Sequence, residues 1–427
     1  MIAVTDQSKA RPVADRTRLA AAGELIEWLV GDESHELDDA GLAAAFGRRL
    51  RATGLPVDRL TLHLRTLHPE ILGRSVAWAP NEAAEIRERE HGIEDSPGFA
   101  GSPLRRVMET REPLIVRLDG SVGPAWAHTD LFQGRGLVEF VFVPLRNADG
   151  LVGAASFSTA RPSGFTLSDR AALDRIVPAL RNACELRTLR RAESTLLDTY
   201  VGSTTARRVM AGQVRRGEIE MLEAALLLCD LRGFTELSNR LPGERVLDLL
   251  NAYFDRVVPA ITHAGGEVIK FMGDAALAFF HRETPAASCS AALQGAVSAL
   301  DGLARLTPPD AELHAGIALH YGEVSYGNIG SAQRLDFTVI GPDVNLVSRI
   351  QAVCSATGRP LLMSERFAML LDSGTAVATG RHQLTGFVEA ANLYSLADRI
   401  LNRIHDPARE RMTRGLHDAG VRGGAVS

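Results

Sequence analysis

The stretch GGEVIKFMGDAALAFF, residues 265–280, decides the fold of the C-terminal half of this chain. Apolar segments flank the pair Gly273–Asp274, a pattern typical of two antiparallel strands joined by a tight turn. Lys270 interrupts the first segment. The chain has 47 lysine and arginine residues, yet only two of them are lysines, Lys9 and Lys270. A lysine in a chain that otherwise uses arginine indicates a specific need for an ammonium group at this position.

Strands and helices alternate around this hairpin. AALLLCD, residues 224–230, is a short apolar run typical of a strand buried on both faces. Residues 242–266 begin with proline and end with a glycine pair, as helices do. A helix at 286–306, a strand at 312–324 and a helix after residue 345 are expected next. This order predicts an α/β sandwich whose helices cover a mainly antiparallel sheet.

Two carboxylates are expected at one edge of this sheet. Asp230 ends the buried strand and Asp274 lies in the hairpin turn, so they converge if the two strands are neighbours. Paired carboxylates with no histidine or cysteine nearby form a hard-oxygen site suited to Mg²⁺ or Mn²⁺. Each aspartate also has an ordinary interpretation, because Asp230 is a suitable helix cap and Asp274 a common turn residue.

Two further groups of residues are suited to binding a phosphorylated substrate. The backbone amides around Gly233, Phe234 and Thr235 open a helix, where they are placed to cradle phosphates. Asn345 and Arg349 are four residues apart, so they share one helix face and can orient a sugar and stabilise phosphoryl charge. An isolated pair at this spacing is usually a solvated surface pair.

Together, CDLRGFT (229–235), the stretch 265–280 and residues 321–350 closely resemble the catalytic domain of class III nucleotide cyclases. The resemblance covers residues 220–398 and implies a ferredoxin-like, palm-related core. It also implies conversion of ATP to 3′,5′-cyclic AMP and pyrophosphate with two Mg²⁺ or Mn²⁺ ions per site. In that family, two aspartates hold the metals, a lysine and an aspartate read adenine, and an asparagine and an arginine serve the transition state. The matching pairs here are Asp230 and Asp274, Lys270 and Asp336, and Asn345 and Arg349.

The resemblance further implies a homodimer with two symmetric sites, because the metal aspartates come from one protomer and the other four residues from its partner. Lys270 and Asp336 favour ATP, since adenine offers an acceptor and a donor that complement an ammonium and a carboxylate. Guanylate-type relatives have an acidic residue in place of the lysine and a smaller one in place of the aspartate. Thr385, in QLTGF (383–387), departs from the family pattern, which has a lysine there that contacts the triphosphate. Arg381 is a candidate to replace it.

Residues 19–165 are predicted to form a mixed α+β domain. Helical spacing at 40–54, strand patterns at 57–67, 73–80 and 113–118, and a hairpin at 137–159 give a layout that resembles GAF and PAS sensor domains. An unidentified small-molecule ligand is therefore expected. His63, His68, His91 and His128 are candidate haem or metal ligands, although lone histidines are usually ordinary surface or core residues.

Residues 166–219 are predicted to be a helical connector with one apolar stripe, which includes Leu180, Leu186 and Leu189. The stripe fits a parallel two-chain connector that would pair two protomers, or a helix that lies on its own domain. Residues 1–18 are expected to be a disordered tail and residues 399–427 a flexible tail.

Composition excludes several other functions. The net charge is only −5, which does not indicate a nucleic-acid partner. No apolar run is long enough to span a membrane, no signal peptide is evident, and four scattered cysteines fit a cytoplasmic protein. We therefore expect an adenylate cyclase. One alternative is a ligand-binding sensor with a weakly active or regulatory cyclase domain. A diguanylate cyclase, suggested by Gly265–Glu267, lacks the rest of its motif, and no phosphate-binding G-x-x-x-x-G-K is present.

Overall fold

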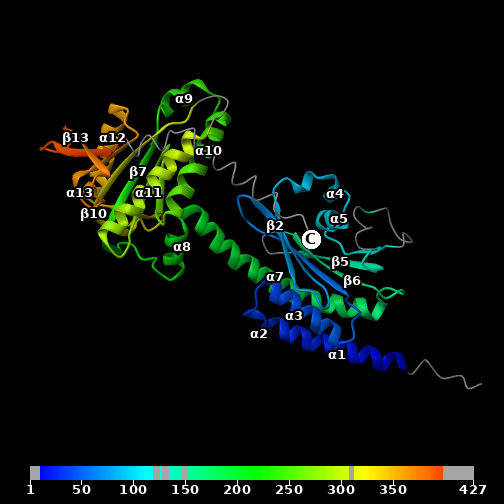
Figure 1. The fold of residues 1–427 in the computed structure, drawn as a ribbon. Coiled ribbons are helices and arrows are strands. Elements are labelled where there is room, and N and C mark those ends of the chain that lie inside the picture. The colour runs from blue at the N-terminus through cyan, green and yellow to red at the C-terminus, as the bar shows by residue number, and fades with distance from the viewer. Residues whose placement is uncertain (1–9, 119–125, 127–133, 147–151, 307–311, 398–427) are drawn as a thin grey trace, which may run out of the picture. The chain divides into compact units, whose positions relative to one another are not determined.

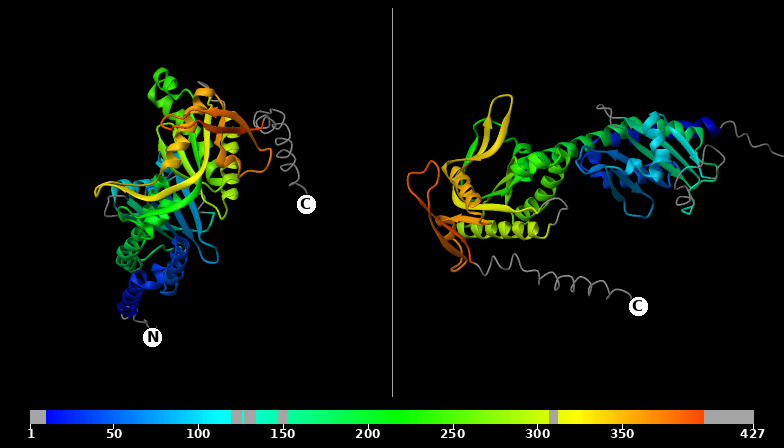
Figure 2. Two further views of the ribbon diagram at one scale, coloured as in Figure 1. Left: turned by 90° about the vertical axis from the view of Figure 1, so that its left-hand side faces the viewer. Right: turned by 90° about the horizontal axis from the view of Figure 1, so that it is seen from above.

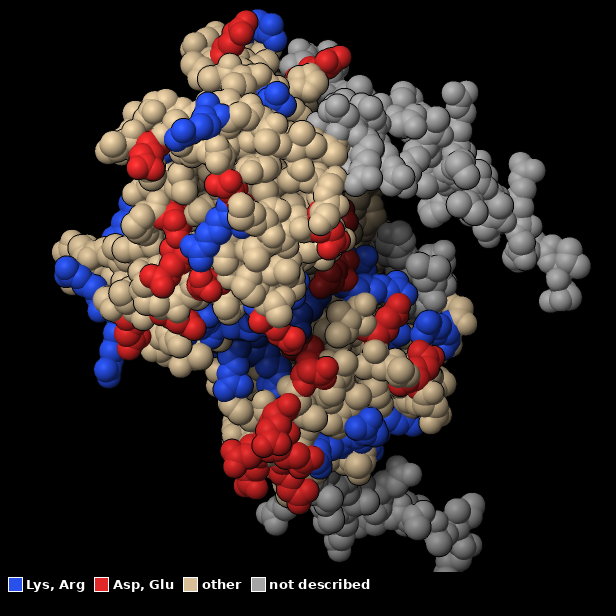
Figure 3. All heavy atoms as spheres, turned by 60° about the vertical axis from the view of Figure 1, so that its left-hand side comes forward, with Lys and Arg blue, Asp and Glu red and all other residues tan. Residues whose placement is uncertain are grey.

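A computed structural model describes residues 10–118, 126, 134–146, 152–306 and 312–397. The chain divides into two compact units, Met1–Leu196 (unit 1) and Leu197–Ser427 (unit 2), which are described separately (Figure 1). Within the described ranges, no helix combines the length and the apolar character that a membrane span requires. In Figure 3, uncharged residues make up most of the visible face, basic side chains gather near its middle, and acidic side chains form a group near its lower edge.

Unit 1 is built on a six-stranded antiparallel sheet with the strand order β3-β2-β1-β6-β5-β4. Its strands are β1 Arg59–Arg65, β2 Ile71–Trp78, β3 Glu85–Glu90, β4 Leu114–Arg117, β5 Glu139–Arg146 and β6 Val152–Thr159. Its helices are α1 Ala10–Val30, α2 Asp32–His35, α3 Asp39–Ala52, the 3₁₀ turn Ile93–Asp95, α4 Pro97–Ala100, α5 Pro103–Thr110 and α7 Leu167–Val201.

The two faces of this sheet differ because side chains alternate along each strand. Leu60 and Leu62 of β1 pack with Phe46 of α3 and Leu180 of α7 in the main core of unit 1. The opposite face carries Thr61 and His63 and is covered by the short helices α4 and α5 (Figure 1). The predicted hairpin at 137–159 is present as the β5–β6 pair, and its turn lies outside the described residues.

Two features of unit 1 differ from the sequence prediction, and a third bears on an interpretation that the sequence left open. Helix α1 begins at Ala10, inside the predicted disordered tail. Strand β3 was not predicted, because its sequence EIRERE is almost entirely charged and all but one of its residues are exposed. Helix α7 packs on its own domain where Leu180 is fully buried, whereas Leu186 and Leu189 are 39% and 47% exposed. Pairing of this helix with a second copy stays a prediction.

Unit 2 is an eight-stranded sheet with the order β13-β14-β12-β10-β7-β9-β8, and β11 pairs with β10. Its strands are β7 Ile219–Leu231, β8 Glu267–Met272, β9 Ala275–Phe280, β10 Ala315–Gly330, β11 Leu335–Ile340, β12 Leu361–Ser364, β13 Ala376–His382 and β14 Ala391–Leu396. Its helices are α8 Ser203–Met210, α9 Phe234–Arg240, α10 Gly243–His263, α11 Pro285–Ala304, α12 Pro342–Thr357 and α13 Glu365–Ala368.

The central strand β7 is buried on both faces, as its apolar run predicts. Leu227 and Cys229 pack in the core beneath α10 and α11, and Leu226 and Leu228 pack in the core beneath α12. Only the β10–β12 pair is parallel among the pairings of this described sheet. Figure 2 shows that the β10–β11 hairpin projects beyond the rest of the sheet. The predicted α+β class and α/β sandwich are confirmed.

Candidate active site

Asp230 and Asp274 meet at one edge of the unit 2 sheet, as the sequence predicts. β7 pairs with β9, and Cys229 lies opposite Ala276, so the end of β7 adjoins the β8–β9 turn. Gly273 in that turn has φ 67°, a conformation that glycine adopts without strain. Burial, and then the charge of Asp274, raise the pKa of Asp230 to about 6. A buried carboxylate whose ionisation is disfavoured beside a second carboxylate is suited to a cation.

The donor set at this edge fits a hard divalent ion. Among the described residues, no group of three or more histidines, cysteines, aspartates or glutamates is placed to hold a metal. The ligands that the protein offers at this edge are therefore the two carboxylates. Mg²⁺ and Mn²⁺ are commonly held by one or two carboxylates together with substrate phosphates. Asp230 and Asp274 are therefore suited to hold ions that a phosphorylated substrate would also bind.

The predicted phosphate loop follows directly after β7. Gly233 has φ 68° and precedes the first turn of α9, which contains Phe234 and Thr235. A Cβ atom at Gly233 would have no neighbour within 4 Å. The loop therefore borders open space, and glycine is needed there for its backbone conformation rather than for lack of room.

Lys270 and Asp336 also come together, although 66 residues separate them. Lys270 Nζ donates to Asp336 Oδ2 at 3.3 Å, from β8 to β11. Their side chains are 34% and 61% exposed. The pair presents an ammonium and a carboxylate side by side to solvent. Together they offer a planar ligand one hydrogen-bond donor and one hydrogen-bond acceptor.

Asn345 and Arg349 lie one turn apart on α12, and both are exposed. Within the described part of the chain, neither side chain has a hydrogen-bond or ion-pair partner. A guanidinium that is not engaged by the protein is available to an anion.

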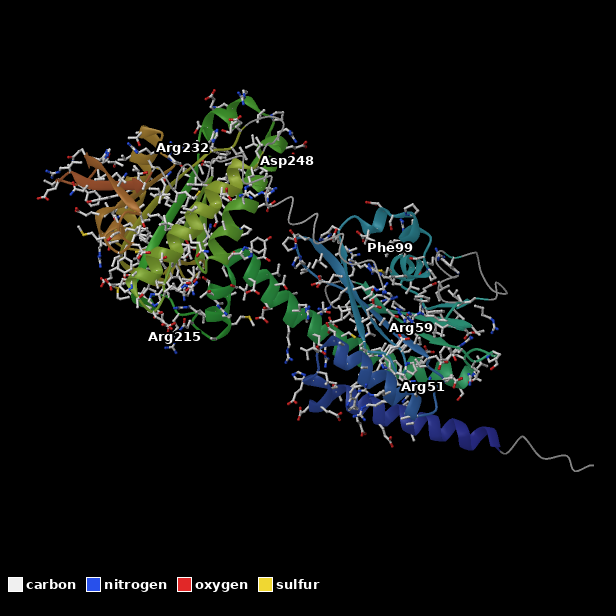
Figure 4. The ribbon with its side chains drawn as sticks, in the orientation of Figure 1. Arg51, Arg59, Phe99, Arg215, Arg232 and Asp248 are labelled. Atoms are coloured by element: carbon white, nitrogen blue, oxygen red, sulfur yellow. The ribbon has the colours of Figure 1, made fainter. Side chains whose placement is uncertain are left out.

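Sequence reasoning missed the residues that fix α12. Arg232, labelled in Figure 4, donates to the carbonyls of Ser355 (3.2 Å) and Arg359 at the C-terminal end of the helix. At the other end, Asp343 accepts from the backbone amide of Glu323 at 2.7 Å. The sequence does carry one signal for this contact, because Asp343 lies in the first helical turn, after the Gly-Pro pair that opens α12.

Gly322 and His320 of β10 complete the contact that holds the N-terminal end of α12 through Asp343. A Cβ atom at Gly322 would lie 2.0 Å from Asp343 Oδ2, so only glycine admits the carboxylate. His320 Nε2 lies 3.1 Å from Asp343 Oδ1, and its Nδ1 is 2.7 Å from Ser364 Oγ. Burial lowers the pKa of His320, so the ring is held neutral between two polar partners.

The structure also shows where Thr385, Arg381 and the candidate ligand His68 lie. Thr385 is exposed in the loop after β13, and Arg381 Nη2 donates to the Ala390 carbonyl at 3.3 Å. In unit 1, His68 Nδ1 accepts the backbone amides of Glu70 and Ile71 at 3.0 and 3.1 Å, and so holds the β1–β2 turn.

The remaining histidines of unit 1 are also accounted for. His91 lies 2.9 Å from the His68 carbonyl, and His63 lies 3.0 Å from Ser75 Oγ. His128 lies outside the described residues. His63, His68 and His91 thus have local polar partners, which favours the ordinary structural interpretation over ligation of a haem or metal.

Family comparisons agree with both halves of this architecture. Residues 219–396 match the family described as the adenylate and guanylate cyclase catalytic domain, and residues 47–183 match the GAF domain. These matches put a segment similar to GAF domains before a segment similar to adenylate and guanylate cyclase catalytic domains. The predicted resemblance is therefore confirmed for both halves, while the boundaries of the connector and tails stay predictions.

Curated relatives match about a third of the chain. An uncharacterized protein of Mycobacterium tuberculosis is 36% identical over 145 residues, which cover 33% of this chain and 26% of the relative. An adenylate cyclase of Anabaena cylindrica is 32% identical over 152 residues, which cover 33% of this chain and 29% of that protein. The matched segments thus span less than a third of these relatives' own length.

Solved structures give matches of similar extent. The adenylyl cyclase CyaB from P. aeruginosa is 28% identical with a TM-score of 0.39, covering 42% of this chain and 96% of that one. The guanylyl cyclase Cya2 is also 28% identical, with a TM-score of 0.37, covering 42% of this chain and 93% of that one.

Proposed function

We propose that this GAF-linked cyclase converts ATP to 3′,5′-cyclic AMP and pyrophosphate. The observation that carries the choice of ATP is the 3.3 Å pair formed by Lys270 and Asp336. Adenine presents a ring-nitrogen acceptor and an amino donor, which an ammonium and a carboxylate complement. Guanine presents the opposite polarity, and a mismatched base would leave polar groups unpaired.

The reacting part of the substrate would lie along the other residues of the site. Asp230 and Asp274 would hold two Mg²⁺ or Mn²⁺ ions, which supply activation of the ribose 3′-hydroxyl and neutralisation of the triphosphate. The amides after Gly233 would orient the phosphates. Arg349 would stabilise charge on the α-phosphate and Asn345 would orient the ribose, so their contribution is positioning and electrostatic stabilisation.

A homodimer would complete each site, with the aspartates of one protomer facing the adenine pair and α12 of its partner. The two strands that carry Lys270 and Asp336, β8 and β11, also expose apolar side chains: Phe271, Met272 and Ile340 are 53%, 44% and 47% exposed. Exposed apolar side chains of this kind suit a surface that another copy covers. The state of the GAF domain would regulate closure of this dimer through α7.

A second candidate is a ligand-binding sensor whose cyclase domain is weakly active or regulatory. Thr385 favours it, since the loop after β13 lacks the lysine that many relatives place against the triphosphate. The intact set of six residues favours the first candidate, because a regulatory domain has no need of a complete base-reading pair.

Turnover by the full-length protein tests the proposal. ATP and GTP are supplied in turn, with Mn²⁺ and then Mg²⁺, and cyclic nucleotide is quantified chromatographically. We expect cyclic AMP from the wild type, loss of at least about 10²-fold in Asp274→Ala, and a loss in Lys270→Glu that is larger with ATP than with GTP.

Asp301→Ala is the matched control, because Asp301 lies on α11 and pairs with Arg305 at 2.6 Å, away from the site. It should turn over ATP as the wild type does. Preference for GTP in the wild type would contradict the assignment of Lys270 and Asp336. Undiminished turnover in Asp274→Ala would contradict the metal site, and no product with either metal would favour the sensor.

A further inference from the structure

Unit 1 contains a cavity of about 640 Å³ on the sheet face opposite α1, α3 and α7. Strands β1, β2 and β6 form its floor, and α4, α5 and the segment before them form its roof. Figure 4 labels a residue from each side, Arg59 on β1 and Phe99 on α4. Cavities of about 300–1,000 Å³ are the usual size for small-molecule sites. The cavity is therefore large enough for a ligand of several rings.

One part of the cavity wall is apolar. Its residues come from the roof helices and from β5, and they are Ile93, Phe99, Leu104, Met108, Phe140 and Phe142. Phe140 and Phe142 are also stacked, with ring centroids 5.8 Å apart. Aromatic rings and a methionine form an adaptable wall that suits the flat or elongated body of an organic molecule.

The rest of the lining is unusually rich in guanidinium groups. Four of the cavity's arginines are compensated by carboxylates: Arg65 by Glu94 (3.2 Å), Arg87 by Glu85 (2.7 Å), Arg135 by Glu82 (3.4 Å), and Arg74 by Asp39. Arg59 and Arg89 have no such partner anywhere in the described ranges of the chain. The cavity therefore carries two guanidiniums that no carboxylate of the described residues contacts directly.

These two charges act on the same place, the floor of the cavity around His63. Burial, followed by the charges of Arg89 and Arg59, lowers the pKa of His63 to about 4, so this ring is neutral near pH 7. Burial and the charge of Arg135 lower the pKa of Arg59 as well. The Nε of Arg59 is buried without a hydrogen-bond partner among the described residues. Positive potential and an unused donor thus coincide beside the apolar wall.

An ordinary surface interpretation does not fit these two arginines. Arginine on a surface extends its guanidinium into water, whereas Arg59 and Arg89 are both partly buried in the cavity. The charges of Glu82 and Glu85 act on Arg59, but no carboxylate in the described ranges bonds to Arg59 or Arg89. A bound anion would supply the missing charge-assisted hydrogen bonds.

We propose that this cavity binds a small organic anion, with a carboxylate or phosphate head beside His63, where the charges of Arg59 and Arg89 both act, and an apolar body against Phe99 and Phe140. Neutral His63, held by Ser75 Oγ at 3.0 Å, offers its other ring nitrogen to the same head group. This inference concerns the ligand class of the GAF domain. It does not rest on the proposed cyclase reaction, because binding can be measured without turnover.

A matched pair of fluorescent probes tests the anion requirement. 8-Anilinonaphthalene-1-sulfonate and N-phenyl-1-naphthylamine share one skeleton and differ by the sulfonate. Each is titrated into the full-length wild type and into Arg59→Gln and Arg89→Gln. Arg181→Gln is the control, because Arg181 lies on α7 and bonds to Asn182, outside the cavity. Thermal unfolding verifies that each variant is folded.

We expect the sulfonate to bind the wild type at least about tenfold more tightly than the neutral probe. Arg59→Gln and Arg89→Gln should each weaken the sulfonate at least about fivefold and leave the neutral probe unchanged, and Arg181→Gln should change neither. Equal affinity for the two probes would overturn the proposal. Equal affinity of the sulfonate for the wild type, Arg59→Gln and Arg89→Gln would also overturn the proposal, because the probe would then lie elsewhere.

Competition then distinguishes the two head groups. 1-Naphthoate, 1-naphthyl phosphate and 1-naphthol are used to displace the bound sulfonate. Displacement by either anion and not by the alcohol supports the proposal, and the tighter anion identifies the head group. Equal displacement by the alcohol would overturn it, because the apolar wall alone would then account for binding.

Discussion

His320 Nε2 lies 3.1 Å from Asp343 Oδ1, and this contact ties the first turn of α12 to the central strand β10. Arg232 ties the last turn of the same helix to the end of β7, beside Asp230. The helix that carries Asn345 and Arg349 is thus fixed at both ends to the two strands that organise the site. Neither His320 nor Asp343 is among the residues proposed to touch substrate, so both are positioning residues.

Asp343→Ala should lower turnover through misplacement of α12. The variant loses the contacts to His320 and to the Glu323 amide, and leaves a cavity beside Gly322. Since a displacement of about 1 Å can cost about 10²-fold in rate, we expect kcat to fall about 10- to 100-fold with a smaller change in KM for ATP. The free energy of unfolding of unit 2 should fall by about 1–3 kcal/mol.

Glu323→Ala is the control for this prediction, because its backbone amide makes the contact and its side chain is exposed. It should leave kcat and unfolding unchanged. A rise in KM without a loss of kcat in Asp343→Ala would instead indicate that Asp343 affects substrate binding alone.

The residues that we propose to carry chemistry lie in patterns that the sequence makes evident, whereas the residues that hold them in place do not. Asp230, Asp274 and Lys270 lie in short patterns whose spacing relates directly to a strand end or a turn. The Lys270–Asp336 contact spans 66 residues and depends on the β10–β11 hairpin folding beside β8, which a motif does not specify. Arg232 is an ordinary charged residue in sequence, and its role appears only when the end of α12 is placed beside β7.

The secondary structure likewise divides into elements that the sequence predicts and elements that it does not. Strand β7 and helix α10 were evident because continuous or periodic apolar residues mark them. Strand β3 was not, because it lies at the sheet edge with charged side chains, a pattern that protects an edge from further pairing but hides it from hydrophobic analysis. For α7, the sequence left two interpretations open, because the same apolar stripe contains leucines that are buried in unit 1 and leucines that are exposed.

Unit 1 should lose stability as the pH falls from about 6.5 towards 4. His63 is held neutral because its folded pKa is lowered to about 4, whereas the unfolded chain protonates near its ordinary value of 6.5. The unfolded state therefore binds more protons in this window, and stability present above pH 6.5 is lost below it. The wild type should lose about 1–2 kcal/mol more between pH 7 and pH 5 than His63→Gln does.

Tryptophan fluorescence in urea measures this effect in unit 1 alone, because the chain's three tryptophans, Trp28, Trp78 and Trp126, all belong to that unit. His91→Gln, at an exposed histidine, should keep the wild-type pH dependence. Identical pH dependence in the wild type and His63→Gln would show that this imidazole does not contribute.

Thr385→Lys should strengthen ATP binding. The loop after β13 is exposed, and an ammonium there would add attraction to the triphosphate. We expect KM for ATP to fall about 3- to 10-fold at low ionic strength, and the gain to shrink as salt is added. Ser373→Lys, in another exposed loop of unit 2, adds the same charge elsewhere and should leave KM unchanged. Equal effects of the two lysines would mean that net charge alone is responsible.

Leu186→Glu combined with Leu189→Glu should weaken self-association of the full-length chain. Both leucines are exposed on α7, at 39% and 47%, whereas Thr188 and Ala192 of the same stretch are buried. In a parallel helix pair they would face the partner copy, and two glutamates would place like charges in that contact. Analytical ultracentrifugation should show the dimer dissociation constant rising at least about tenfold, with cyclase activity falling at low protein concentration.

Arg191→Glu is the control, because Arg191 is exposed on the same helix on the side away from these leucines. It should leave the dissociation constant unchanged. If the double leucine variant dimerised as the wild type does, α7 would serve unit 1 alone. A signal from the GAF domain would then have to reach the cyclase domain by another segment than this helix pair.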